Sequence, residues 1–235
     1  MSVNIQNNKN KCYVVPVQKT CNLRCFFCST KIYPYNKQEI MVIDEKFFKN
    51  ILMLKKKRTN YFEITGGGEP FLNPQLQEII DKIRENFPQA FIKLYTNGRI
   101  RHKYCGIDEL NISAVHWDEK VVQAICGGYG TYSLIETLSY FRDNYSNQIR
   151  LSIPMLNKGI GTAKQAKYII EITKKYVDKY VFRPMNTFVA EHETMSASFE
   201  LDMKNVEIDK EFCSCNEIDL WFSDNELYRK WDLSI

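Results

Sequence analysis

Residues 13–28 read Tyr-Val-Val-Pro-Val-Gln-Lys-Thr-Cys-Asn-Leu-Arg-Cys-Phe-Phe-Cys, so an apolar run leads directly into three closely spaced cysteines. The apolar residues 13–17 predict a short buried strand. The cysteines Cys21, Cys25 and Cys28 form a C-x3-C-x2-C array in a polar segment, which we expect to be a loop from residue 18 to about residue 37. The stretch therefore predicts a strand followed by a metal-binding loop.

The spacing of the cysteines narrows the choice of metal. Three thiolates converge only when the loop wraps around one centre, and soft thiolates select iron–sulfur clusters, zinc or copper(I). A structural zinc site takes a fourth ligand, usually from a second Cys/His pair at tight spacing. No such pair follows Cys28 nearby. The array therefore favours a [4Fe-4S] cluster in which one iron has no protein ligand and can bind a substrate.

A second motif follows about forty residues later. The strand expected at 61–65 stops at Thr65-Gly-Gly-Gly-Glu-Pro70. In parallel α/β folds ligands bind at the carboxyl ends of the strands, and glycines let the backbone approach a ligand closely. Glu69 places a carboxylate beside that approach, where it suits an ammonium group.

Alternating strands and helices fill the rest of the chain. We expect strands at 13–17, 61–65, 91–95, 110–117, 150–154 and 180–184. We expect helices at 44–56, 73–86, 132–144 and 162–176, the second beginning at Asn73-Pro74. Such alternation predicts an α/β fold with a parallel sheet and right-handed crossovers, and six strands fit a partial (β/α)6 barrel better than a closed eightfold one.

Apolar stripes on two helices indicate which faces are buried. For the first helix the stripe is expected to comprise Phe47, Phe48, Ile51 and Leu52, and for the second Leu76, Ile79, Ile80 and Ile83. The tail differs, because residues 219–223 and 226–230 flank Asp224-Asn225 and predict a β-hairpin that covers one end of the barrel. The whole chain 1–235 is interpreted as one domain, with a core at about 12–190 and a capping segment at about 191–235.

Composition excludes some functions. The 235 residues carry a net charge of +4, too little to indicate nucleic-acid binding. No segment is long and apolar enough to cross a membrane, and the polar N-terminus does not resemble a signal peptide. We therefore expect a cytoplasmic protein whose eight cysteines are metal ligands or buried thiols rather than disulfides.

Together the cysteine array, with Phe27 before its last cysteine, and the run Gly67-Gly68-Glu69 resemble the signature motifs of the radical S-adenosylmethionine (SAM) superfamily. The resemblance implies that Cys21, Cys25 and Cys28 hold a [4Fe-4S] cluster. It further implies that SAM chelates the open iron and that reductive cleavage yields a 5′-deoxyadenosyl radical, which removes a hydrogen atom from the substrate. A low-potential donor such as flavodoxin or ferredoxin is the expected reductant. The residues expected at the cofactor are Phe27, Gly67, Gly68, Glu69, Asn97, Ser152 and Met155.

The substrate is less defined than the cofactor. Ser29-Thr30-Lys31 after the last cysteine resembles the Cys-Asp-Thr-Lys run of the carboxydeazaguanine synthases, with Ser29 in place of the aspartate. That resemblance implies a Mg²⁺ site near Thr30. Size and the Cys-Ser-Thr-Lys run are also similar to queuine lyase, which implies a small 7-deazapurine substrate and a lyase reaction in queuosine salvage.

Three alternatives remain open. One is an activase that places a glycyl radical on a partner enzyme, and another is a protein that only binds its ligand. The third is a peptide-modifying enzyme with an auxiliary cluster, suggested by Cys213 and Cys215, with Cys12, Cys105 and Cys126 as companions. Candidates for contact with the substrate are the polar residues near later strand ends: His116, Asp118, Arg183 and Asn186.

Overall fold

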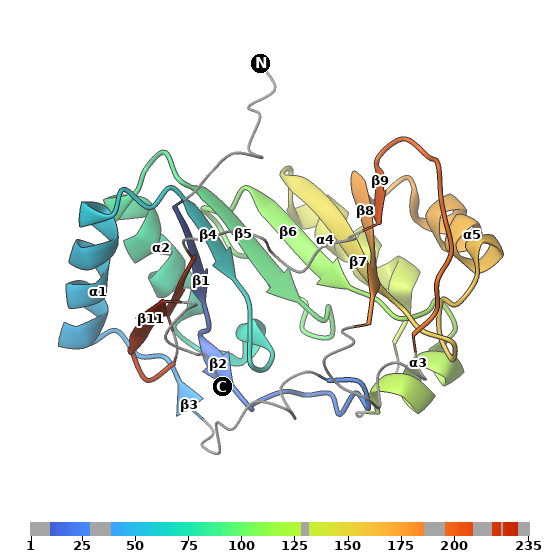
Figure 1. Cartoon of the computed structure of the whole chain (residues 1–235), viewed down its shortest axis with the longest axis horizontal. Helices are drawn as coiled ribbons and strands as arrows, with labels where there is room; N and C mark the ends of the chain where they lie inside the picture. Colours follow the sequence, from blue (N-terminus) through green and yellow to red (C-terminus); the bar gives the residue numbers. More distant parts are fainter. Residues whose placement is uncertain are drawn as a thin grey trace.

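The computed structural model describes residues 10–28, 39–127, 132–185, 196–208, 218–221 and 223–229. Within these residues nine strands form one sheet in the order β11-β10-β1-β4-β5-β6-β7-β8-β9, and β2 and β3 form a separate antiparallel pair (Figure 1). Every neighbouring pair in the large sheet is parallel except β10 and β11. The sheet is the predicted partial barrel, and its first and last strands do not pair with each other.

Six consecutive strands make the predicted core. They are β1 (Lys11–Val14), β4 (Tyr61–Ile64), β5 (Phe91–Thr96), β6 (Glu109–Ser113), β7 (Gln148–Met155) and β8 (Lys179–Pro184). One of them, β4, ends one residue early, and two others end three and four residues before their expected carboxyl ends. The first predicted strand stops before Pro16, which has no amide hydrogen for a ladder, and the chain resumes as β2 (Val17–Gln18) against β3 (Glu39–Ile40). The fourth predicted strand ends at Ser113 because the chain then turns into a helix.

Helices cover one face of the sheet. They are α1 (Glu45–Lys56), α2 (Leu76–Asn86), α3 (Glu119–Cys126), α4 (Leu134–Asn144) and α5 (Ala163–Thr173). Figure 1 shows α1 and α2 beside the half of the sheet that contains β1 and β4, and α5 beside the half that contains β7 and β8. Four of the five begin at a side chain that accepts a hydrogen bond from the first turn: Asp44, Asp118, Ser133 and Thr162.

The buried face of α2 is the predicted one, but that of α1 is not. Phe47, Ile51 and Leu54 are buried, whereas Phe48 and Leu52 are 45% and 59% exposed. Positions i, i+4 and i+7 lie on one side of a helix, and the residues that follow Phe47 and Ile51 are rotated by about 100° away from it. The predicted stripe therefore mixed two faces.

The C-terminal hairpin is confirmed in its strands but wrong in its expected place. Strands β10 (Ile218–Trp221) and β11 (Leu227–Arg229) are antiparallel. However, β10 pairs in parallel with β1, with Tyr13 opposite Leu220. The hairpin therefore extends the sheet beside its first strand instead of covering one end of the barrel, because the unpaired edge of β1 offers it a full ladder of backbone partners.

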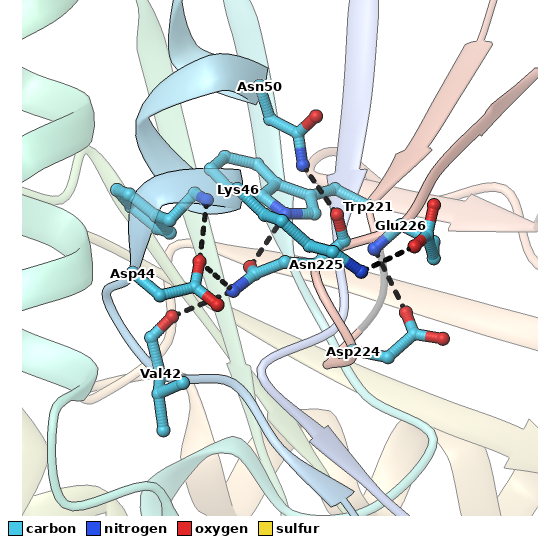
Figure 2. A network of polar contacts seen from close by, with 9 residues as sticks. Val42, Asp44, Lys46, Asn50, Trp221, Asp224, Asn225 and Glu226 are labelled. Carbon is cyan, nitrogen blue, oxygen red and sulfur yellow. Dashed lines mark hydrogen bonds and ion pairs between the residues drawn. The ribbon is translucent and has the colours of Figure 1, made fainter.

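A polar network fixes the turn of this hairpin to α1 (Figure 2). The Asn225 amide accepts a hydrogen bond from Trp221 Nε1 (3.1 Å) and donates to the Val42 carbonyl (2.9 Å) and to Asp44 Oδ1 (2.8 Å). The Asn225 carbonyl accepts from Asn50 Nδ2 (2.9 Å). Asn225 has φ +57°, a left-handed conformation that Asn tolerates better than most residues.

The two faces of the sheet differ in polarity because side chains alternate along each strand. The face toward the helices is apolar, with Ile64, Leu94 and Ile112 all inaccessible to solvent. We call the opposite side the inner face. Ion pairs join neighbouring strands across it: Lys11–Glu63 (2.6 Å), Lys93–Glu109 (2.8 Å) and Lys179–Glu207 (2.8 Å). Glu207 belongs to β9 (Val206–Ile208), and it also reaches past β8 to Arg150 of β7 (3.4 Å). Among the described helices, none has the length and apolarity needed to cross a bilayer.

Candidate functional site

The segment that carries the three cysteines begins where β2 meets the glycine turn of residues 65–70. Lys19 N donates to the Gly67 carbonyl (2.9 Å), and Glu69 N donates to the Thr20 carbonyl (3.0 Å). Gln18 and Gly67 form a parallel bridge. The two predicted motifs therefore run side by side, and their backbones are joined one residue before Cys21. We call residues 19–28 the cysteine loop.

One glycine of the turn is required by this contact. A Cβ on Gly68 would lie 2.2 Å from the Thr20 carbonyl oxygen, closer than real Cβ atoms approach backbone. The same atom on Gly67 would make ordinary contacts, with the Gln18 side chain at 3.4 Å and with backbone no closer than 3.5 Å. Gly68 therefore lets the turn lie against the cysteine loop, a reason for glycine that is independent of any ligand.

These distances predict a difference between two alanine substitutions. Gly68→Ala is expected to displace the cysteine loop, because neither the Cβ nor the Thr20 carbonyl can move alone. We expect the reconstituted variant to retain less than about half of the wild-type iron, since the loop can no longer gather its ligands. Gly67→Ala is the matched control and is expected to retain nearly all of it. Equal iron contents in the two variants would contradict the structural role assigned to Gly68.

Amide donors surround the first cysteine. Cys21 Sγ accepts from Leu23 N (3.4 Å) and from Asn97 Nδ2 (3.8 Å). Asn97 Nδ2 also donates to Asn22 Oδ1 (2.7 Å), so the turn after β5 is joined to the cysteine loop. N–H donors directed at sulfur stabilise a thiolate that carries iron.

The far side of the cysteine loop lies against the end of α3. Arg24 N donates to the Cys126 carbonyl (2.7 Å) and Phe26 N to the Ile125 carbonyl (3.2 Å). In Figure 1 the blue trace of the loop crosses the lower part of the view from β2 to α3. The buried Cys126 thiol forms a hydrogen bond with Cys25, which lowers the pKa of Cys126. Sequence reasoning grouped Cys126 with Cys213 and Cys215, and nothing in its spacing indicated the Cys25 contact.

Whether the cysteine loop suits a [4Fe-4S] cluster depends on its donors. In the part of the chain that the structure describes, no three His, Cys, Asp or Glu side chains converge on one point. The three thiols nevertheless share one ten-residue loop, held at both ends by backbone hydrogen bonds, with N–H donors toward Cys21. Three soft ligands on an accessible loop fit an iron–sulfur cluster with one open iron.

Glu69 has structural partners that the motif alone did not reveal. Its carboxylate accepts from the Thr96 hydroxyl (2.7 Å), Asn97 N (2.7 Å) and Phe71 N (3.2 Å). The side chain therefore joins the turns that follow β4 and β5, and it caps the short helix η3 (Pro70–Leu72). Burial raises the pKa of Glu69 to about 7, although the backbone hydrogen bond from Asn97 opposes the shift.

This raised pKa predicts a pH dependence of stability. The folded state favours the protonated acid, so the contribution of Glu69 is fully present below pH 4.5 and is lost as the pH rises through about 7. The total change is about 3 kcal/mol at roughly 1.4 kcal/mol per pKa unit. The free energy of unfolding of cluster-free wild type should therefore fall relative to that of cluster-free Glu69→Gln as the pH rises from 4.5 to 8. Denaturant unfolding should show the two values converging or crossing in favour of the variant. Parallel pH profiles would show that Glu69 does not titrate in this range.

The other residues expected at the cofactor lie in different surroundings. Phe27 is half-buried and meets Phe26 edge to face, with ring centroids 5.7 Å apart. Ser152 is buried on the inner face, opposite Ser113 and Val181. Met155 is 1% exposed and belongs to the apolar core on the helix side, so its side chain packs there and only its backbone faces the strand ends.

Two of the expected substrate residues already have structural roles. Asp118 is the N-cap of α3 and accepts from Lys120 N (2.8 Å) and Val121 N (3.3 Å). His116 is buried, stacks on Trp117 at 3.9 Å and accepts from Asp118 N through Nδ1 (3.0 Å). Burial lowers the pKa of His116, which keeps the ring neutral near physiological pH. Both residues shape the turn from β6 to α3.

Arg183 is the expected residue that the structure places on the inner face. Its guanidinium lies 6.0 Å from the centre of the Tyr95 ring. Because β6 and β7 lie between β5 and β8, this contact reaches across the concavity of the sheet. Tyr95 in turn donates to Glu63 (2.8 Å). Asn186, Thr30, Cys213 and Cys215 lie outside the described residues, as does the proposed Mg²⁺ site near Thr30.

Comparison with known families agrees with this geometry. The family model described as "Radical SAM superfamily" matches residues 15–177, which include the cysteine loop, the glycine turn and four of the six core strands, β4 to β7. The chain belongs to the radical SAM superfamily. This match confirms the resemblance drawn from the motifs, and membership implies a [4Fe-4S] cluster and SAM as cofactors of an enzyme.

Curated relatives share about half of the chain. A probable GTP 3′,8-cyclase of Methanococcus aeolicus is 30% identical over 132 residues, which are 53% of this chain and 44% of that protein. A second, from Archaeoglobus fulgidus, is 32% identical over 120 residues, or 48% and 38% of the two chains. The chain therefore spans less than half the length of either relative.

Solved structures extend the likeness in fold to nearly the whole chain. Streptococcus suis SuiB bound to S-adenosylmethionine has a TM-score of 0.68 and 14% identity, over 93% of this chain and 59% of that one. TYW1 with a lysine-pyruvate adduct has a TM-score of 0.54 and 17% identity, over 83% and 67%. At these identities the likeness concerns the fold alone.

Proposed function

We propose that this radical SAM enzyme abstracts hydrogen from a small purine-type heterocycle. When bound, the cluster and SAM together supply the 5′-deoxyadenosyl radical, after a donor such as flavodoxin or ferredoxin has supplied an electron. The observation that carries the proposal is the joining of the cysteine loop to the turns after β4 and β5, through Gly67, Glu69 and Asn97.

The residues of the chain have separate tasks in this proposal. Cys21, Cys25 and Cys28 hold the cluster at one rim of the sheet. The Gly67–Gly68 backbone takes the methionine end of SAM, while the Glu69 carboxylate fixes the neighbouring Thr96–Asn97 turn and attracts the ammonium group. Because Glu69 already accepts three hydrogen bonds, its contribution to SAM binding comes mainly from holding these two turns in register.

The substrate class follows from the inner face. That face is polar and carries both signs of charge in ion pairs, which suits a small hydrogen-bonding molecule better than an apolar one. The named activity of the curated relatives, a GTP 3′,8-cyclase, acts on a guanine nucleotide and supports a purine-type substrate. A 7-deazapurine such as queuine belongs to the same chemical class, although the run from Ser29 to Lys31 that suggested it lies outside the described residues.

Direct binding distinguishes this proposal from the alternatives. Anaerobically reconstituted protein saturated with SAM would be titrated with GTP, queuine and guanine, and the melting temperature followed. A ligand that binds only the folded state raises that temperature, by an amount set by its concentration relative to its Kd. A rise with at least one purine-type compound is expected. No shift, together with a glycyl radical on a partner enzyme or a modified peptide, would replace the proposal with the corresponding alternative.

A further inference from the structure

One strand of the inner face contains a buried amide without a hydrogen bond. Asn111, in the middle of β6, is 0% exposed. Neither its Nδ2 nor its Oδ1 has a hydrogen-bond partner within the described structure. A buried polar group left unpaired costs about 1–3 kcal/mol, so natural proteins rarely retain one without a purpose.

The neighbours of Asn111 place this amide among other inward polar groups. In the strand register Asn111 lies opposite Tyr95 on one side and Arg150 on the other. Arg150 Nε is also buried without a hydrogen bond in the described residues, and its terminal nitrogens make only long contacts, to Glu109 (3.8 Å) and Glu207 (3.4 Å). Two adjacent strands therefore present unused donors and an unused acceptor at one level of the barrel.

Asn111 lies deeper in the barrel than the expected position of the cofactor, measured from the carboxyl ends of the strands. Asn111 is two residues from the carboxyl end of β6 at Ser113, about 7 Å along the strand. The cysteine loop and the glycine turn lie at that same end of the sheet. A molecule that reached Asn111 from the rim would therefore lie between the unpaired amide and the SAM-binding turns.

We propose that Asn111, beside Arg150, recognises the lactam edge of an oxopurine-type substrate, which supplies the hydrogen bonds that the amide lacks. This inference rests on the proposed function and names the part of the substrate that is read. A primary amide offers one donor and one acceptor side by side. A lactam presents the complementary N–H and C=O on the same side of its ring, so the two pair in a bidentate manner.

The same geometry disfavours other amides. In a trans peptide bond the N–H and C=O point in opposite directions, so one asparagine cannot pair with both groups of a single peptide unit. A 6-aminopurine has a donor where the lactam has its oxygen and an acceptor where the lactam has its N–H. Asn111 can match that edge only by turning its amide over, whereas the guanidinium of the neighbouring Arg150 has only donors, which suit the lactam oxygen and not the 6-amino group.

Three nucleotides that differ only in the base test the proposal. GTP and ITP carry the lactam edge and ATP carries the 6-amino edge, with the same ribose and triphosphate. For wild-type protein saturated with SAM, we expect GTP and ITP to raise the melting temperature more than ATP. Isosteric Asn111→Leu should weaken GTP and ITP binding about tenfold to a hundredfold while leaving ATP binding unchanged. Equal binding of the three nucleotides by the wild type, or discrimination that survives in the variant, overturns the proposal.

The stability of the variants provides a second, independent test. Replacing an unpaired buried amide by an apolar group of the same shape removes a desolvation cost, so Asn111→Leu should raise the melting temperature of ligand-free protein. Asn111→Asp, which buries a carboxylate, should lower it. A lower melting temperature for Asn111→Leu would mean that the amide is already paired without ligand, and would overturn the proposal.

The yield of 5′-deoxyadenosine from the wild type, measured on the same preparation, tests the proposed function separately. SAM cleavage without nucleotide discrimination would reject the lactam subsite and leave the radical chemistry in place. Discrimination without SAM cleavage would reject the proposed reaction and support the subsite.

Discussion

Replacing Cys25 by alanine is expected to abolish reductive cleavage of SAM without unfolding the protein. The loop would lose one of three thiolates and could no longer hold the cluster at a defined position. Cys25 is only partly buried at the edge of the apolar core and belongs to no core strand or helix, so circular dichroism and the melting temperature of cluster-free protein should stay close to wild type. We expect about four irons per chain in the reconstituted wild type and less than about half of that in Cys25→Ala.

A matched control exists for this substitution. Cys105 is an exposed thiol in the turn before β6, outside the cysteine loop. Cys105→Ala should keep both iron content and 5′-deoxyadenosine formation. If Cys25→Ala still produced 5′-deoxyadenosine at the wild-type rate, the assignment of the cluster to this loop would be wrong. Iron near eight per chain in the wild type would instead favour a second cluster.

The largest effect on stability is expected at Asn225. Asn225→Ala removes three side-chain hydrogen bonds, to Trp221, Val42 and Asp44, and places alanine at a positive φ. We expect the free energy of unfolding to fall by about 3 kcal/mol, because buried partners are left unpaired and the left-handed backbone is strained. Urea unfolding measured by tryptophan fluorescence would report the change.

Two further variants separate the loss of hydrogen bonds from the strain in the backbone. Asn225→Gly removes the same hydrogen bonds but relieves the backbone strain, so it should lose about 1 kcal/mol less than alanine does. Asp224→Ala, at the exposed neighbouring position, removes the hydrogen bond from Glu226 N (3.0 Å) and a negative charge near the exposed Lys46, and it should cost about 1 kcal/mol or less. If Asn225→Ala were no worse than Asp224→Ala, the network in Figure 2 would not be what attaches the hairpin to α1.

The sequence predicted the sheet well because turn and helix-cap residues mark clearly where one element ends and the next begins. Glycine runs, caps and apolar alternation located all six core strands, and the buried residues of α2 were those expected. The errors came from longer-range contacts. Whether the hairpin covers the barrel or pairs with β1 depends on a free edge of β1, which no local pattern reports. Phe48 and Leu52 were misplaced because two adjacent apolar pairs fit either face of a short helix.

The site was predicted in part for the same reason. The cysteines and the Gly67-Gly68-Glu69 run are contiguous motifs, so their spacing alone indicated chemistry. Glu69 binding to the turn after β5 and Cys126 reaching Cys25 join segments far apart in the chain. The sequence did not identify Asn111 as a site residue, because a single asparagine in an apolar strand is common and only the structure shows that its amide is unpaired. His116 and Asp118 looked like substrate residues, but the turn into α3 uses both.

The formation of 5′-deoxyadenosine tests the central claim most directly. Anaerobically reconstituted wild-type protein would be mixed with SAM and dithionite, and the products separated by liquid chromatography with mass detection. The account predicts 5′-deoxyadenosine and methionine in equal amounts, formed only when both cluster and reductant are present, and none from Cys25→Ala. Intact SAM in a preparation that holds about four irons per chain and accepts an electron would contradict it.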